Sequence, residues 1–188
     1  MSKVFIVFLG LFLVACSATQ TANFNAPKVA FSPENNSEVI DNAYEPIILK
    51  YQDLLKGVMA NDTAYLFTIT RELIQLTDSL DKINYEQAPV TKDLFKMGLY
   101  NVNAELKGLL ASETLTDIPM SMNMLSLQLL HALGQVGYKE KTIYIYSVSD
   151  KTINDGLLWL SQQKSMRDPY HREQKTILNA DQVLQELK

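Results

Sequence analysis

The sequence lacks most of the residue patterns that identify a chemistry. Its 188 residues include a single cysteine, so it has no internal disulfide framework. Lys and Arg number 17 against 21 Asp and Glu, and no run of one sign forms a patch or a tail. Because phosphate binding rests on clustered Lys and Arg, this balance argues against nucleic acid as a partner.

Catalytic signatures are also missing. The chain has no G-x-S-x-G sequence, no P-loop and no Rossmann glycine fingerprint. Its two histidines, His131 and His171, lie far apart, and neither has an acidic residue at a metal-ligand spacing such as H-E-x-x-H. We therefore expect no enzymatic activity and no cofactor.

Apolar runs are short, and the clearest one lies near the start, over Val4–Val14. It falls short of the roughly 20 residues that a membrane-spanning helix needs, and it follows Lys3, as in a secretion signal. The run Leu13-Val14-Ala15-Cys16 resembles the lipobox of bacterial lipoproteins. We expect residues 1–15 to be a signal peptide and Cys16 to be lipidated. The alternative is a cytosolic apolar helix with a buried cysteine.

The lipobox resemblance implies a location. Cys16 would carry a diacylglycerol thioether and often an N-acyl chain, and two or three chains hold a protein firmly on a membrane. Ser17 is similar to the sorting context of outer-membrane lipoproteins, so we expect an anchor in the outer membrane with the domain facing the periplasm. Residues 16–43 are rich in Ser, Thr, Asn and Pro and predict a flexible tether, followed by a folded domain over 44–188.

Apolar side chains at three- and four-residue spacing predict four helices in that domain. The first is expected from Glu45-Pro46, because proline suits a first helical turn. The second follows the N-cap candidate Asp62 to about Ile83. The third begins near Thr91. The fourth runs from Asp117-Ile118-Pro119 to Gly134 or Gly137, and the short loops predict an up-down bundle.

The pattern changes after the fourth helix. Thr142–Val148 alternates and is rich in β-branched and aromatic residues, which indicates a strand. Gly156–Ser161 is expected to pair with it as a hairpin, and Ala180–Leu187 is expected to form a short final helix. The predicted fold is therefore mainly α: a four-helix bundle with a C-terminal β-hairpin and a short closing helix.

Two sequence pieces carry a family resemblance. The segment from Gly156 to Ser161 contains Trp-Leu-Ser, and Arg167-Asp168-Pro169-Tyr170 contains Pro-Tyr. With Leu54-Leu55 and Ala60-Asn61-Asp62, these make residues 47–188 resemble the bacterial family called domain of unknown function 3347. That resemblance implies a periplasmic or lipid-anchored protein that accompanies heavy-metal efflux, with a suspected role in copper handling.

The chain departs from that family where the family has soft metal ligands. Val148-Ser149-Asp150-Lys151 stands where the family has a Cys-Pro-Met-Ala-like motif, and Leu178-Asn179-Ala180 offers neither Cys nor Met. A metal role therefore does not carry over. We expect a non-enzymatic, lipid-anchored periplasmic domain that binds a protein partner, as an accessory of an envelope or efflux system.

The alternative function is weak binding of Cu(I) or Ag(I), since thioethers and imidazoles are ligands for soft cations. On a helix, Met120 and Met124 share a face, and His131 lies two turns beyond Met124. The competing interpretation is that the methionines pack in the core with one at the surface, since Met fills irregular gaps. Similarly, His131 can be an ordinary core or boundary residue.

Three residues near the C-terminus are candidates for a binding surface: Trp159, Tyr170 and His171. The competing interpretation makes Trp159 the core anchor of the hairpin, because a large ring suits the seam between a strand and a bundle. His171 can likewise pack in place of the aromatic residue that the family usually has after Pro-Tyr.

Overall fold

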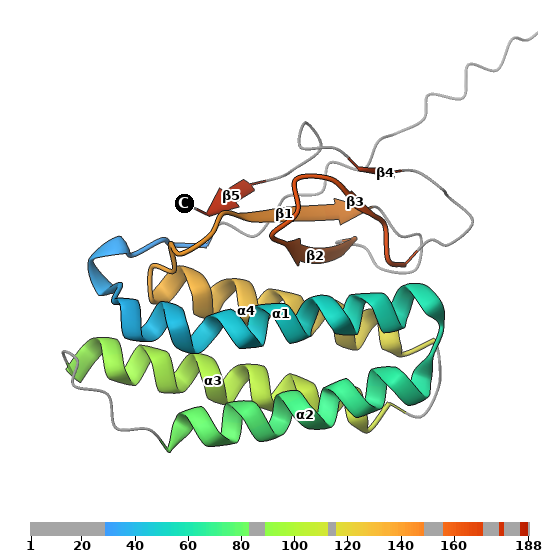
Figure 1. The fold of residues 1–188 in the computed structure, drawn as a ribbon, viewed down its shortest axis with the longest axis horizontal. Coiled ribbons are helices and arrows are strands. Elements are labelled where there is room, and N and C mark those ends of the chain that lie inside the picture. The colour runs from blue at the N-terminus through green and yellow to red at the C-terminus, as the bar shows by residue number, and fades with distance from the viewer. Residues whose placement is uncertain are drawn as a thin grey trace, which may run out of the picture.

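The computed structural model describes residues 29–82, 89–112, 116–148, 156–170, 177–178 and 185–187. Within these ranges the chain forms a mainly α fold with a small sheet (Figure 1). The helices are η1 (Pro33–Asn35), α1 (Glu38–Ala60), α2 (Thr63–Asp81), α3 (Pro89–Leu110) and α4 (Ile118–Gln135). The strands are β1 (Ile143–Val148), β2 (Leu157–Ser161), β3 (Met166–Arg167), β4 (Ile177–Leu178) and β5 (Gln185–Leu187).

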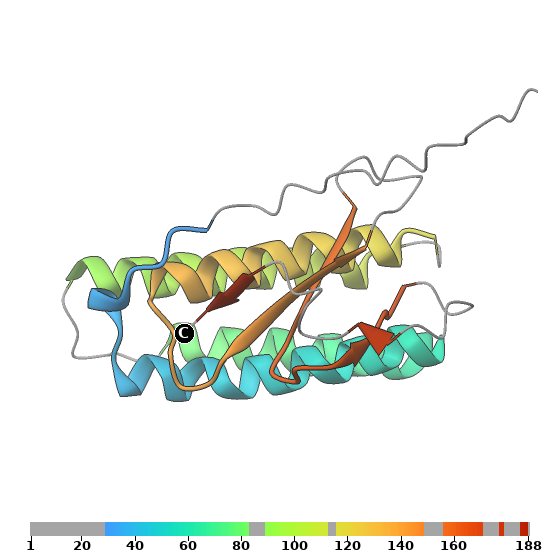
Figure 2. The ribbon, with the colours of Figure 1, turned by 90° about the horizontal axis from the view of Figure 1, so that it is seen from above.

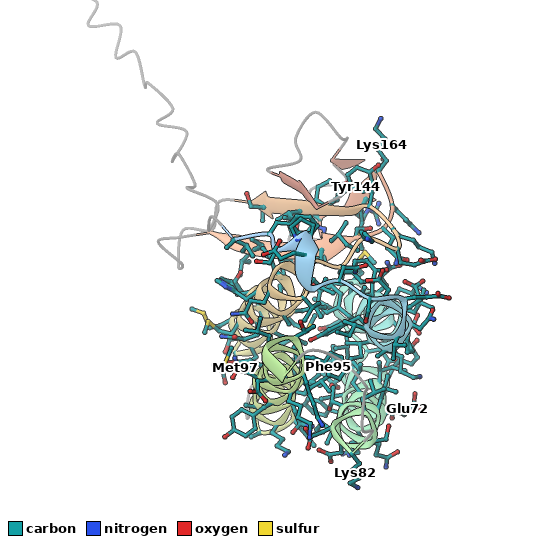
Figure 3. All side chains as sticks on the ribbon, turned by 90° about the vertical axis from the view of Figure 1, so that its left-hand side faces the viewer. Glu72, Lys82, Phe95, Met97, Tyr144 and Lys164 are labelled. Atoms are coloured by element: carbon teal, nitrogen blue, oxygen red, sulfur yellow. The ribbon has the colours of Figure 1, made fainter. Side chains whose placement is uncertain are left out.

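The four long helices form the predicted bundle, and each packs against the next one along the chain. Seen end-on, α1 and α4 lie in the layer beneath the sheet, and α2 and α3 form the layer beyond them (Figure 3). Figure 2 shows β1 and β2 running obliquely across the α1–α4 layer. None of the described helices is long and apolar enough to cross a membrane.

The predicted hairpin is confirmed. β1 pairs antiparallel with β2, with Tyr146 opposite Trp159, and the order of the sheet is β2-β1-β5. β3 and β4 form a separate antiparallel pair. The hairpin packs on the bundle mainly through β2 and α4.

Local signals explain several helix boundaries. The side chain of Asp62 accepts a hydrogen bond from the Tyr65 N–H at 2.9 Å, which confirms it as the N-cap of α2. After α4, Gly137 takes a φ of +63°, and the Tyr138 N–H bonds back to the Leu133 carbonyl. This left-handed turn is the form of helix ending that glycine favours.

The predicted start of the first helix is wrong. α1 begins at Glu38, and Pro46 lies in its interior rather than in its first turn. The side chain of Ser37 caps the helix by accepting from the Ile40 N–H. Ile40 and Tyr44 are fully buried, so core packing extends the helix backward and offsets the hydrogen bond that Pro46 cannot donate.

The expected tether over 16–43 is therefore wrong for residues 29–43. Besides the first turns of α1, this stretch includes Val29, which is buried against the end of α4. The Ser32 N–H donates to the Gly134 carbonyl at 3.1 Å. Figure 2 shows the chain before α1 crossing from α4 toward the start of α1, so this stretch is part of the folded unit.

The expected final helix is wrong for residues 185–187. These residues form β5, which pairs antiparallel with Ile143–Ile145 of β1. Pairing with an available strand edge supplies backbone hydrogen bonds that a short isolated helix lacks, so tertiary context overrides the local helical pattern. The preceding part of the expected helix, 180–184, lies outside the described residues.

Candidate functional site

Trp159 lies in the interior. Its exposed fraction is 0%, and its ring stacks on that of Tyr146 with centroids 5.5 Å apart. The ring of Tyr170 meets it edge-on at 5.8 Å. The structure therefore favours the core-anchor interpretation of Trp159 over a binding surface. Two other predicted site residues, His171 and Cys16, lie outside the described residues.

Polar side chains from outside the sheet hydrogen-bond the backbone groups along the outer edge of β2. The Leu158 N–H donates to Asn123 Oδ1 at 2.7 Å, and the Leu160 N–H donates to the Tyr51 hydroxyl at 3.2 Å. The Tyr170 hydroxyl donates to the Leu158 carbonyl at 3.1 Å. An edge strand with unpaired backbone groups invites pairing with another chain, so these bonds close the edge.

Burial changes the acidity of the two phenols in this network, Tyr51 and Tyr170. Burial raises the pKa of Tyr51, although its hydrogen bond with Ser126 lowers it in part. Burial likewise raises the pKa of Tyr170 well above its ordinary value. Burial thus favours the protonated form of both phenols, and the Tyr170 hydroxyl donates its proton to the strand in that form.

Glu45 of α1 connects the bundle to the loop before β1 and to the turn after β2. Its carboxylate accepts from the Tyr138 hydroxyl at 2.7 Å and from Gln162 Nε2 at 3.0 Å, and it pairs with Lys141. Burial raises the pKa of Glu45, but the hydrogen bonds from Lys141, Tyr138 and Gln162 outweigh it, so the net pKa is lowered. The cluster holds the sheet on the bundle.

The three methionines in the first half of α4 differ in their exposure to water. Met122 is fully buried, whereas Met120 and Met124 are 45% and 39% exposed. The interpretation with one surface methionine is therefore wrong, because two are exposed and one is in the core. The α4 helix presents to the core the side that carries Met122, Leu125 and Leu129.

These exposed methionines belong to a surface without charge. No Asp, Glu, Lys or Arg occurs anywhere in Ile118–Gln135, whereas the other three long helices all carry both signs. Six partly or fully exposed positions define what we call the α4 face: Met120, Met124, Leu127, Gln128, His131 and Gln135. A water-facing helix side of this composition is unusual, because charged residues ordinarily cover such positions.

The adjoining side of α3 carries the small residues Ala104 and Gly108 next to the partly exposed Glu105. A Cβ added at Gly98 would lie 2.8 Å from the Ala132 Cβ, so α3 and α4 approach closely there. The Ser112 and Ser121 hydroxyls lie 3.1 Å apart, which fixes the register of the two antiparallel helices. One turn from each serine, Gly108 is therefore level with Met124–Leu125, and a Cβ at Gly108 would meet nothing within 4 Å.

The structure places only two of the three predicted Cu(I) ligands, Met120 and Met124, close together. Met120 and Met124 lie one turn apart on the surface, so their thioethers can reach one Cu(I) ion. His131 is half-buried and lies about 16 Å along the helix from Met120, which is too far to share that ion. Among the described residues, no group of three or more His, Cys, Asp or Glu could hold a metal.

A hollow that opens to solvent lies at one end of the bundle. It measures about 360 Å³ and lies between the α1–α2 turn, the start of α4, and Pro169-Tyr170. Gly57, Leu66, Ile118 and Tyr170 contribute to its lining, with Asn61 and Asp62 among the polar members.

Sequence reasoning selected Met120, Met124 and His131 as metal ligands and did not recognise the surface they share. The absence of charge over 118–135 was the available signal, but the sequence alone does not show which side of the helix faces water. Comparison of the chain with known protein families, characterised proteins and solved structures finds no match.

Proposed function

We propose that the chain is a lipid-anchored, non-enzymatic domain of the bacterial envelope that binds a protein through the α4 face. The carrying observation is that α4 exposes two methionines and no charged side chain. Charged residues are depleted and Met is enriched at the cores of protein interfaces. An exposed helix side of this kind therefore favours protein recognition over catalysis or nucleic-acid binding.

Three features of the chain support an accessory role in the envelope. The leader ending at Cys16 predicts export and an attachment to the outer membrane. The resemblance to domain of unknown function 3347 favours an efflux or envelope system as the setting. Among the described residues, the phenols of Tyr51 and Tyr170 and the carboxylate of Glu45 hydrogen-bond between the sheet and the bundle, which supports a structural use of these polar groups.

Site-specific photo-crosslinking in living cells tests this proposal. A photoreactive residue is placed at Met124 on the α4 face, or at Arg71, which is exposed on α2. We expect a protein adduct from Met124 that is absent from Arg71, because only the first lies in the proposed interface. Adducts of equal yield at the two positions, or none, would contradict a binding role for the α4 face.

The efflux setting has a separate test. Deletion of the gene is expected to lower tolerance to copper or silver if the partner belongs to an efflux system. The matched comparison is a strain that produces the chain with Met124→Lys, which removes the interface but keeps the anchor. Unchanged metal tolerance in the deletion strain would remove efflux from the proposal and leave only the envelope role.

A further inference from the structure

We propose that residues 17–28, which precede Val29, lie along the α4 face as a strap that the protein partner displaces. This inference rests on the proposed function, because it assigns a regulatory contact to the surface proposed to bind a protein. The described structure fixes the point where the chain joins α4 at Val29 and the course that the chain follows there. Both observations lead from Val29 toward the exposed methionines.

Val29 joins the bundle on the side of α4 that carries the α4 face. A Cβ added at Gly134 would lie 2.4 Å from the Val29 Cγ1, so Val29 packs directly against this glycine. Members of the α4 face precede Gly134 by three, seven, ten and fourteen residues, close to whole helical turns, and form what we call the α4 stripe: His131, Leu127, Met124 and Met120. Val29 therefore covers the turn that continues the α4 stripe toward the end of the helix.

Followed back from α1, the chain beside α4 runs toward the exposed methionines. Ser32 lies level with Gly137, because a Cβ added at Gly137 would be 2.3 Å from the Ser32 carbonyl oxygen. Val29 lies three residues earlier on α4, at Gly134. Residues 29–32 thus run parallel to α4, and the same course before Val29 leads along the α4 stripe.

Exposure along this side of α4 increases with distance from Val29. Gly134, next to Val29, is buried, the middle of the α4 stripe is half-buried, and its far end at Met124 and Met120 is exposed. A strap that continues past Val29 would remove these two apolar side chains from water, which is favourable. The uncharged composition of α4 then has a reason within the chain itself.

The length and composition of the strap match the α4 stripe. Residues 17–27 contain no charged side chain, and Phe24 is their single large apolar residue. Phe24 precedes Val29 by five residues, about 17 Å of extended chain, and Met124 precedes Gly134 by ten residues, about 15 Å of helix. Phe24 is thereby level with Met124, and contacts between an aromatic ring and a thioether are favourable.

The strap regulates the α4 face by competition. Because it belongs to the same chain, its effective concentration at the α4 stripe does not depend on the amount of protein. A partner must displace Phe24 before it can contact Met124. Displacement also frees the 13 residues from Cys16 to Lys28, which span at most about 45 Å, so the bundle can move away from the membrane.

Disulfide trapping in the full-length chain tests the position of the strap. Phe24→Cys is combined with Met124→Cys or, as the matched control, with Gly108→Cys, an exposed position on α3 at the level of Met124. We expect linkage to Met124→Cys to be at least about fivefold faster, because a disulfide requires the two Cβ atoms to lie close together. Similar rates, or linkage between two copies in place of linkage within one, would overturn the strap.

Photo-crosslinking tests the competition. With a photoreactive residue at Leu127, Phe24→Ser is expected to raise the yield of the partner adduct at least about twofold, because the strap no longer competes. Asn25→Ser, in the same segment, is the matched control and should leave the yield unchanged. An unchanged yield in Phe24→Ser would overturn the regulatory role.

The outcomes separate this inference from the proposed function. Preferred trapping at Met124 with a raised adduct yield in Phe24→Ser supports both. Equal trapping rates with a specific protein adduct from the α4 face would overturn the strap and keep the protein-binding role. Preferred trapping at Met124 with no protein adduct above that from Arg71 would support the docked strap and overturn the protein-binding role.

Discussion

At the scale of single residues, several polar side chains hydrogen-bond between the sheet and the bundle. Glu45 illustrates this best, since Tyr138, Gln162 and Lys141 all donate to its carboxylate. Tyr138 is fully buried, so its hydroxyl has no water to replace a lost acceptor. Leaving such a group unsatisfied costs about 1–3 kcal/mol.

Replacement of Glu45 is therefore expected to reduce stability in a pH-dependent way. The pKa of Glu45 is lower folded than its ordinary value of 4.5. Its carboxylate thus stabilises the fold above pH 4.5, and this contribution is lost as the pH falls through the folded pKa. We expect Glu45→Gln to lower the free energy of unfolding at pH 7, and the difference from wild type to shrink below pH 4.5.

Urea unfolding at a series of pH values measures this difference. Glu34→Gln, at an exposed position outside the Glu45 cluster, is the matched control and should follow the wild type throughout. An unfolding difference for Glu45→Gln that stays constant or grows down to pH 3 would contradict the assigned role of the carboxylate.

At the scale of elements, the informative case is β2, an edge strand that is buried along its whole length. Its outward N–H groups are satisfied by Asn123 and Tyr51 from two different helices. Asn123→Leu keeps the side-chain size but leaves the Leu158 N–H without its acceptor. We expect a loss of about 1–3 kcal/mol and faster hydrogen exchange at the Leu158 amide.

Amide exchange followed residue by residue distinguishes this effect from general destabilisation. Asn42→Leu, on the exposed side of α1, is the control. If the Leu158 amide exchanges no faster than its neighbours in Asn123→Leu, the side-chain cap of β2 is unimportant.

At the scale of the whole molecule, the folded unit begins earlier in the chain than the sequence pattern predicted. A chain that begins at residue 44 would lose the helix cap Ser37 and the buried Ile40 and Val29. Removing one large buried side chain alone costs about 2–5 kcal/mol. We expect a chain beginning at residue 44 to be largely unfolded by circular dichroism, and one beginning at residue 29 to unfold cooperatively.

Much of the fold followed from local patterns. The repeat of apolar positions predicted four helices in the right order, Asp62 marked the start of α2, and the alternation in Thr142–Val148 predicted the hairpin. The errors arose where distant contacts override local preference. Pro46 suggested a helix start, but buried Ile40 and Tyr44 extend α1 beyond it, and residues 185–187 pair with β1 instead of closing as a helix.

The candidate site was less accessible to sequence reasoning. Met120, Met124 and His131 drew attention as possible ligands, and Trp159 as a possible surface. For the three residues on α4, exposure depends on how that helix is rotated about its axis between α3 and β2. For Trp159, exposure depends on how β2 packs on the bundle. Neither can be read from the local sequence. Packing buries Met122 and Trp159 and exposes Met120 and Met124.

The sequence by itself determined the helical class, the hairpin and the absence of charge over 118–135, because each is a property of neighbouring residues. Its leader pattern remains a prediction of export and lipidation at Cys16. Only the tertiary structure decided which side of α4 is exposed, where the folded unit begins and how the edge of β2 is closed. Those features depend on contacts between residues far apart in the chain, such as Asn123 and Leu158. No pattern of neighbouring residues predicts such a contact.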